Sequence, residues 1–160
     1  MDKRDLEQLL SDVADGAVAP ADALTRIQTT PTADLGFAQL DLSRGVRQGA
    51  GEVVYGAGKT AEQIAAIIEA LRDAGQERIL VTRLDSEKAA RTSELLGNGI
   101  DLGYVLDAQL ALVGGKPSPT GNGRIVVACA GTSDLPVAEE AALTAEFYGN
   151  EVDRLYDVGV

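Results

Sequence analysis

Two short loops in this sequence contain the residue types that bind phosphate. Residues 56–60 read GAGKT and residues 131–134 read GTSD, and each loop stands between an apolar run and a helical pattern. Glycine lets the backbone approach a ligand closely, and the free amides at a helix N-terminus attract anions. Lysine adds a cation in the first loop, and hydroxyl groups add hydrogen-bond donors in the second. Both loops are therefore candidates for contact with a phosphorylated ligand.

The first loop resembles the phosphate-binding motif of nucleotide hydrolases, G-x-x-x-x-G-K-[ST], but fails its spacing test. With Gly58, Lys59 and Thr60 as the end of the motif, its first glycine would occupy the position of Val53. A P-loop hydrolase is therefore not expected. The alternative is a tight turn in which Thr60 caps the next helix and Gln63 completes a capping box. Lys59 remains a candidate for anion contact at that helix N-terminus.

The second loop follows the apolar strand RIVVACA and precedes a helix with Pro136 in its first turn. Backbone amides, the positive helix end and two hydroxyls converge there, which suits a phosphate or a ribose. The alternative is that Ser133 or Asp134 only caps the helix. The only cysteine, Cys129, lies inside the apolar strand and is expected to be buried and inert.

Composition excludes several classes of function. The 160 residues carry a net charge of −11 and include no histidine, so a nucleic-acid partner, an anionic membrane and histidine-based catalysis are not expected. A single cysteine cannot form an internal disulfide or a zinc cluster. The N-terminus lacks an apolar signal core and no apolar run approaches the length of a membrane span. We expect a folded cytoplasmic protein.

The elements that position the two loops follow from hydrophobic periodicity. Residues 1–28 predict a helical hairpin, and residues 29–34 read as a polar linker. Residues 35–113 alternate between strand and helix patterns and predict a small α/β domain. Its expected strands are 37–42, 52–56, 78–83 and 101–107, and its expected helices are 60–74 and 86–96.

Residues 114–123 are rich in glycine and proline and read as a linker to a second unit. That unit, residues 123–160, predicts a strand, a helix from about residue 135 to 148, and a second strand. We expect the two strands to be parallel and the connection to be right-handed. Two strands and one helix leave one face of the sheet poorly covered, so we expect this end of the chain either to pack against another copy or to be disordered.

The sequences of two segments resemble the LarB family, the pyridinium-3,5-biscarboxylic acid mononucleotide synthases of nickel-pincer nucleotide biosynthesis. These segments are DLGFAQLDLSRGVRQGAGEVVYGAGKTAEQ and VACAGTSDLPVAEEAALTAEFYGNEVDRLYDVGV. The resemblance runs from about Ala33 to Val160, and AGTSDxPVAEEA with DVGV after it is its most specific part. The AGTSDxPVAEEA motif is also similar to the GSxSD loop of the carboxylase PurE. The implied fold of residues 123–160 is the first βαβ element of a PurE-like, flavodoxin- or Rossmann-type parallel sheet.

The resemblance implies an enzyme that carboxylates the pyridinium ring of nicotinic acid adenine dinucleotide with CO2 or bicarbonate and hydrolyses its phosphoanhydride to release AMP. It implies substrate binding by Gly131, Thr132, Ser133 and Asp134. Asp41, Arg44, Arg47, Glu52 and Lys59 also match family positions, and Arg44, Arg47 and Lys59 are the candidates for a positive patch. A homo-oligomer, a tetramer or an octamer, is expected. Magnesium is the expected ion if one shields the diphosphate, with Asp134 or Glu139 as ligands through water.

The resemblance also implies a nucleophilic cysteine in a segment that follows DVGV in the family. Because this sequence ends at Val160, we expect it to be an incomplete part of the enzyme that forms no product by itself. Cys129 stands before the GTSD loop and matches no catalytic motif of the family. The alternative function is a nucleotide-binding or assembly module without chemistry of its own.

Overall fold

The computed structural model describes residues 3–28, 32–41, 53–97 and 99–159. It divides the chain into two compact units, Met1–Glu52 and Val53–Val160, which are described separately below. The domain boundaries expected from the sequence, after residue 34 and within residues 114–123, stay predictions. No helix in the described part of the chain is long and apolar enough to cross a membrane.

The first unit contains two helices and a small hairpin. Helices α1 (Lys3–Ala14) and α2 (Pro20–Gln28) confirm the helices predicted for this region. Strand β1 (Thr32–Asp34) pairs antiparallel with β2 (Gln39–Asp41). The interpretation of residues 29–34 as linker was wrong for β1, because the Asp34 carboxylate accepts from the Gly36 amide at 2.8 Å and so closes a turn that lets polar residues pair.

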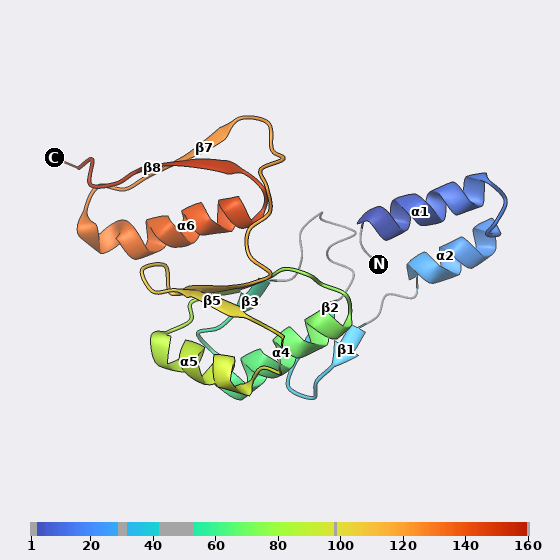
Figure 1. The fold of residues 1–160 in the computed structure, drawn as a ribbon, viewed down its shortest axis with the longest axis horizontal. Coiled ribbons are helices and arrows are strands. Elements are labelled where there is room, and N and C mark those ends of the chain that lie inside the picture. The colour runs from blue at the N-terminus through green and yellow to red at the C-terminus, as the bar shows by residue number, and fades with distance from the viewer. Residues whose placement is uncertain (1–2, 29–31, 42–52, 98, 160) are drawn as a thin grey trace. The chain divides into compact units, whose positions relative to one another are not determined.

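The second unit contains a four-stranded mixed sheet in the order β3-β4-β6-β5. Its strands are β3 (Val53–Tyr55), β4 (Ile79–Thr82), β5 (Leu102–Val105) and β6 (Leu110–Val113). Strands β3 and β4 are parallel, whereas β6 runs antiparallel to both of its neighbours. Helices α4 (Ala61–Asp73) and α5 (Ser86–Leu95) cover one face of the sheet (Figure 1).

Strand β6 was missing from the sequence prediction. All four of its residues are buried, because it lies between β4 and β5 with both faces covered. A strand covered on both faces shows no apolar and polar alternation, so its short run before the Gly114-Gly115 pair lacks the pattern that identifies a half-exposed strand.

Residues 124–155 form a second, two-stranded sheet. Strands β7 (Arg124–Ala128) and β8 (Glu151–Leu155) are parallel, as predicted, and α6 (Leu135–Phe147) connects them. In Figure 1, α6 lies between this pair and the four-stranded sheet. Its residues Leu143 and Phe147 join Leu80, Leu110 and Leu112 in one apolar cluster.

The face of the β7–β8 pair away from α6 carries exposed apolar side chains. Val126, in the middle of β7, is 57% exposed, and Leu155, at the end of β8, is 50% exposed. One face of this sheet is therefore poorly covered, as the sequence predicts, and packing against another copy stays a prediction. Parallel strands are normally covered on both faces, so this surface is unusual for an isolated βαβ element.

Candidate functional site

The carboxyl ends of β7 and β8 bring the GTSD loop beside residues 157–159. Because the strands are parallel, the segments that follow them leave from the same edge of the sheet. The Val158 amide donates to the Cys129 carbonyl at 3.2 Å, and the Gly159 amide donates to the Ala130 carbonyl at 3.0 Å. These bonds extend the pairing past both strands, up to the first residue of the loop.

Gly159 is required by this close approach. A Cβ atom at position 159 would stand 2.5 Å from the Ala130 carbonyl oxygen, closer than real Cβ atoms come to other groups. Asp157, two residues earlier, has a left-handed φ of 57°, which turns the chain toward the loop. The aspartate and the glycine of DVGV therefore have separate backbone roles.

The GTSD loop forms a single 3₁₀ turn, η1 (Thr132–Asp134), directly before α6. The Asp134 carboxylate accepts from the Gly131 amide at 3.4 Å, so this side chain holds its own turn. No side chain caps α6, because Asp134 has helical dihedral angles and cannot reach the next amides. The capping interpretation for α6 was therefore wrong.

The hydroxyl groups of this loop are available. Thr132 and Ser133 are exposed, and neither hydroxyl forms a hydrogen bond with the described residues. At the start of α6 the Leu135 amide donates to the Thr132 carbonyl, and Pro136 has no N–H group. An anion at this edge of the sheet could therefore accept from the two hydroxyls, close to the positive end of the helix.

Ion pairs hold α6 in place between the two sheets. Arg154 on β8 donates to Glu139 at 3.1 Å and to Glu146 at 2.6 Å, while Arg83 after β4 pairs with Glu140 at 2.7 Å. The hydrogen bond from Arg154, with help from Lys116, lowers the pKa of Glu146. These contacts fix the direction in which the N-terminus of α6 points.

The predicted magnesium ligands have other roles in the structure. Both oxygens of Glu139 accept from Arg154, at 3.1 and 3.4 Å, and Asp134 binds the Gly131 amide. Within the described ranges no group of three or more acidic or cysteine side chains is arranged to hold a metal ion. A magnesium ion held by the protein alone has no built site in this part of the chain.

Cys129 follows β7 and is half-buried. Its amide donates to the Leu155 carbonyl at 3.1 Å, and its carbonyl accepts from Val158, so its backbone belongs to the extended pairing of the two strands. Cys129 therefore stabilises the strand pairing next to the GTSD loop and is not part of the loop.

The first loop, residues 56–60, is closed by its own hydrogen bonds. Thr60 accepts from the Gln63 amide at 3.3 Å and its own amide donates to the Gln63 side chain at 3.0 Å, which confirms the predicted capping box. The Lys59 ammonium group donates to the Tyr55 carbonyl at 3.0 Å. In this structure the lysine is turned toward the strand end and satisfies a backbone oxygen there.

A second lysine at this edge was missed by the sequence analysis. The Lys88 ammonium group donates to the Gly56 carbonyl at 3.1 Å and lies 3.5 Å from the Asp85 carboxylate. Its backbone amide, which donates to the same carboxylate, lowers the pKa of Asp85. Because β3 and β4 are parallel, the helix that opens at Asp85 begins at the same sheet edge as the first loop, and a local sequence pattern does not contain this pairing.

Four predicted residues cannot be compared with the structure. Arg44, Arg47 and Glu52 lie outside the described residues, and the side chain of Asp41 does as well. The predicted positive patch is therefore represented by Lys59 alone, to which the structure adds Lys88.

Two comparisons with known proteins found matches to this chain. A family model described as the LarB/PurE-like N-terminal domain matches residues 32–113, half of the chain. A protein of Methanocaldococcus jannaschii, named only as uncharacterized, is 32% identical over 124 residues, which cover 76% of this chain and 48% of that protein. The chain therefore spans about half the length of the curated relative it matches.

Proposed function

The chain belongs to the LarB/PurE-like N-terminal domain family, and from this membership we propose that it is part of a LarB-type carboxylase and hydrolase. The proposed substrate is nicotinic acid adenine dinucleotide. The proposed reaction replaces one C–H bond of the pyridinium ring with a C–C bond to the carbon of CO2 and releases the ring proton; with bicarbonate that proton leaves in a water molecule. Water also adds across the phosphoanhydride, which releases AMP. It would be the first step in making a nickel-pincer nucleotide.

The observation that carries the proposal is the pairing of residues 158 and 159 with the two residues that precede the GTSD loop. Both segments belong to the sequence motif that resembles the family, and the Val158 and Gly159 amides donate to the Cys129 and Ala130 carbonyls at the carboxyl edge of two parallel strands. Ligands of open α/β sheets bind at this edge. The motif is thus a spatial unit, and its Thr132 and Ser133 hydroxyls have no partner among the described residues.

Each residue of the loop has a proposed role. The Thr132 and Ser133 hydroxyls would donate to phosphate oxygens beside the N-terminus of α6, and Gly131 would let the backbone approach the substrate closely. Asp134 would keep the turn in shape through its bond to Gly131. Lys59 would bind a phosphate by exchanging its present carbonyl partner for the anion. Arg44 and Arg47 are proposed to place positive charge beside the phosphates of the same substrate.

The finer fold belongs to the same proposal. We take β7, α6 and β8 as the first βαβ element of a PurE-like parallel sheet, with a homo-oligomeric assembly of four or eight chains. The support is the exposed face of the pair, where Val126 and Leu155 have no cover among the described residues. Strand β7 is apolar at four consecutive positions from Ile125 to Ala128, which is typical of a strand buried on both faces.

Cys129 is not proposed as the nucleophile. Its amide donates to Leu155 at the end of β8, its carbonyl accepts from Val158 beyond that strand, and no base among the described residues shares a hydrogen bond with its thiol. The role of this chain in the reaction is to bind and orient the dinucleotide, and we expect the covalent step to need a group outside residues 53–159.

Binding and turnover separate the enzyme proposal from its alternative. The chain is titrated with nicotinic acid adenine dinucleotide while its amide NMR spectrum is followed, and shifts are expected at Gly131, Ser133 and Gly159. Absence of binding would contradict the proposal. The chain is then incubated with the substrate and isotope-labelled bicarbonate, and no AMP or labelled product is expected. Product formation would show that this chain is itself catalytic and would return Cys129 to consideration.

The alternative, a nucleotide-binding or assembly module, makes a different prediction for specificity. A module that reads only phosphate should bind the dinucleotide and its mononucleotide halves with similar affinity. A site built for the LarB-type substrate should prefer the intact dinucleotide over AMP by about tenfold or more, because it also contacts the second nucleotide half. A tenfold preference corresponds to roughly 1.4 kcal/mol of binding free energy.

A further inference from the structure

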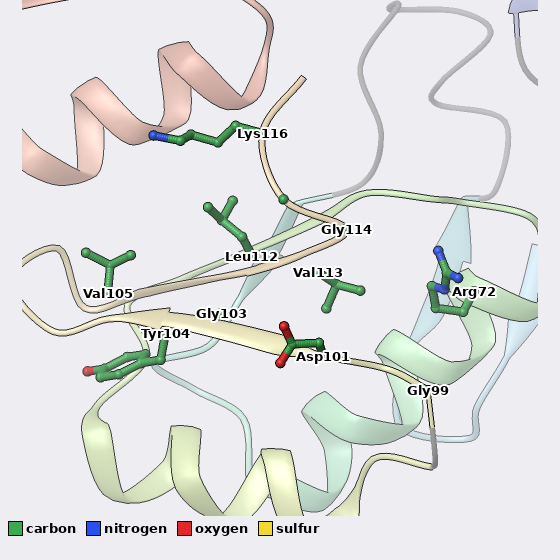
Figure 2. A pocket seen from close by; sticks show the side chains of 11 residues that line it. Arg72, Gly99, Asp101, Gly103, Tyr104, Val105, Leu112, Val113, Gly114 and Lys116 are labelled. Carbon is green, nitrogen blue, oxygen red and sulfur yellow. The ribbon is translucent and has the colours of Figure 1, made fainter. Parts of the chain in front are cut away.

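A cavity of about 470 Å³ lies beside β5, and none of its lining residues belongs to the two loops described above. Figure 2 shows its floor around Gly103, with Val105 and Leu112 near one side and Arg72 and Asp101 at one end. Small-molecule sites usually occupy roughly 300 to 1,000 Å³. The cavity therefore has the size of a ligand site.

The cavity runs along β5, which is the edge strand on the other side of the sheet from β3. Its lining includes Val113, which pairs with Ile79, the first residue of β4. The first loop follows the last residue of β3, at the other end of that parallel pair. A ligand in this cavity would therefore occupy a separate site.

The hollow exists because Gly103 has no side chain. Gly103 pairs with Leu112, and paired residues project to the same face, where Leu112 joins Leu143 and Phe147 in the apolar cluster. The backbone does not require a glycine here: a Cβ atom would meet the Leu112 carbonyl oxygen at 3.5 Å, an ordinary contact. A glycine in a strand interior weakens the strand and often marks the close approach of a ligand.

The charged end of the cavity is pre-arranged. One guanidinium nitrogen of Arg72 donates to the Glu77 carbonyl at 2.9 Å and to the Gln76 carbonyl at 3.5 Å, which holds the side chain while its other nitrogens stay unused among the described residues. Asp101 is exposed and has no hydrogen-bond or ion-pair partner in the described part of the chain. Gly99, Gly114 and Gly115 also line the cavity and add no side chains to it.

We propose that this cavity is a separate binding site for a purine mononucleotide. Asp101, directly before β5, is followed along the strand by Gly103 and Val105. The ribose and the base of such a ligand follow one another in the same order. The base would lie over Gly103 against Leu112 and Val105, the ribose hydroxyls would donate to Asp101, and the phosphate would accept from Arg72. The choice of AMP as the ligand rests on the proposed function, because that reaction releases AMP.

The first test maps where AMP binds. The chain is titrated with AMP and its amide spectrum is followed, with shifts expected at Gly99, Gly103, Gly114 and Gly115. Adenosine should bind about tenfold more weakly, since it lacks the group that Arg72 would hold. Absence of AMP binding, or shifts confined to Gly131 and Gly159, would overturn the inference.

The second test fills the cavity. Gly103→Leu should raise the Kd for AMP by about tenfold or more, because the new side chain occupies the space of the base. Gly97→Leu is the matched control, since Gly97 is exposed and does not line the cavity, and it should leave the Kd within about twofold. Equal binding by both variants would overturn the inference.

Two further variants keep the test decisive if Gly103→Leu does not fold. Asp101→Asn and Arg72→Gln change charge without adding volume, and each should weaken AMP binding by about fivefold to tenfold. Unchanged binding in both would overturn the inference. Binding of nicotinic acid adenine dinucleotide at Gly131 is read in the same spectra. If the dinucleotide binds at Gly131 but AMP causes no shift at Gly103, this site is rejected and the proposed function stands. If AMP shifts Gly103 but the dinucleotide does not bind at Gly131, only the proposed function is rejected.

Discussion

The loop after β3 and the loop after β7 share a plan in sequence but use their polar groups differently. Both connect a strand to a helix of 13 residues through glycine and hydroxyl side chains. In the first loop Thr60 and Gln63 bond each other's backbone, and Lys59 bonds a carbonyl. In the second loop Thr132 and Ser133 have no partner among the described residues. The first loop is satisfied internally, whereas the second can accept a ligand.

The two loops also differ in how closely another segment approaches. Residues 157–159 lie against the residues that precede the second loop, and Gly159 has no room for a Cβ atom. In the first loop a Cβ atom added at Gly56 would meet the Thr82 carbonyl oxygen at 3.0 Å, and around Gly58 no atom would come within 4 Å. The second backbone therefore approaches more closely beside the second loop, at Gly159, than beside the first.

The largest expected effect tests this difference in space. Gly159→Ala should reduce the free energy of unfolding by about 2 kcal/mol or more, because the Cβ atom would collide with the Ala130 carbonyl and separate the two segments. Gly58→Ala is the control and should change it by no more than about 0.5 kcal/mol. Thermal and urea unfolding of both variants measure the values. Equal effects would contradict the assigned difference between the loops.

The second prediction concerns the ion pairs that hold α6 behind the second loop. Arg154 and Lys116 lower the pKa of Glu146 below its ordinary value of 4.5. The carboxylate is favoured in the folded state, so its contribution is complete above pH 4.5 and is lost as the pH falls through the lowered folded pKa. Stability should therefore decline on acidification in that window.

Glu146→Gln should remove most of this pH dependence and cost about 1 to 2 kcal/mol at neutral pH, between the values typical of exposed and buried pairs. The Glu146 side chain is 18% exposed and that of Arg154 is 29% exposed, so the pair is partly shielded from water. Glu62→Gln is the control, because the Glu62 side chain is 63% exposed beside Arg91. Urea unfolding at a series of pH values measures both. An unchanged acid slope in Glu146→Gln would contradict the role of the pair.

Sequence reasoning was most successful where the structure depends on neighbouring residues. The capping box of Thr60 and Gln63 follows from their spacing of three residues and is confirmed. Strand β6 and the position of Lys88 depend on strand pairing between distant segments, which a local pattern does not contain. The contact between Gly159 and Ala130 likewise requires the register of β7 and β8. The roles proposed for Arg44 and Arg47 stay predictions, since the structure does not describe these residues.

The smallest expected effect separates the loops by what each hydroxyl does. Thr60→Ala should lower the free energy of unfolding by about 1 kcal/mol, the usual cost of a lost N-cap, and leave dinucleotide affinity unchanged if Lys59 keeps its position. Ser133→Ala should leave stability within about 0.5 kcal/mol, because the Ser133 hydroxyl has no partner among the described residues. It should weaken binding of nicotinic acid adenine dinucleotide by about 1 kcal/mol or somewhat more, since a hydrogen bond to a charged group is lost. Calorimetric titration and urea unfolding of both variants provide the four values. If Ser133→Ala loses stability and keeps its affinity, the second loop is structural like the first, and the proposed substrate site is wrong.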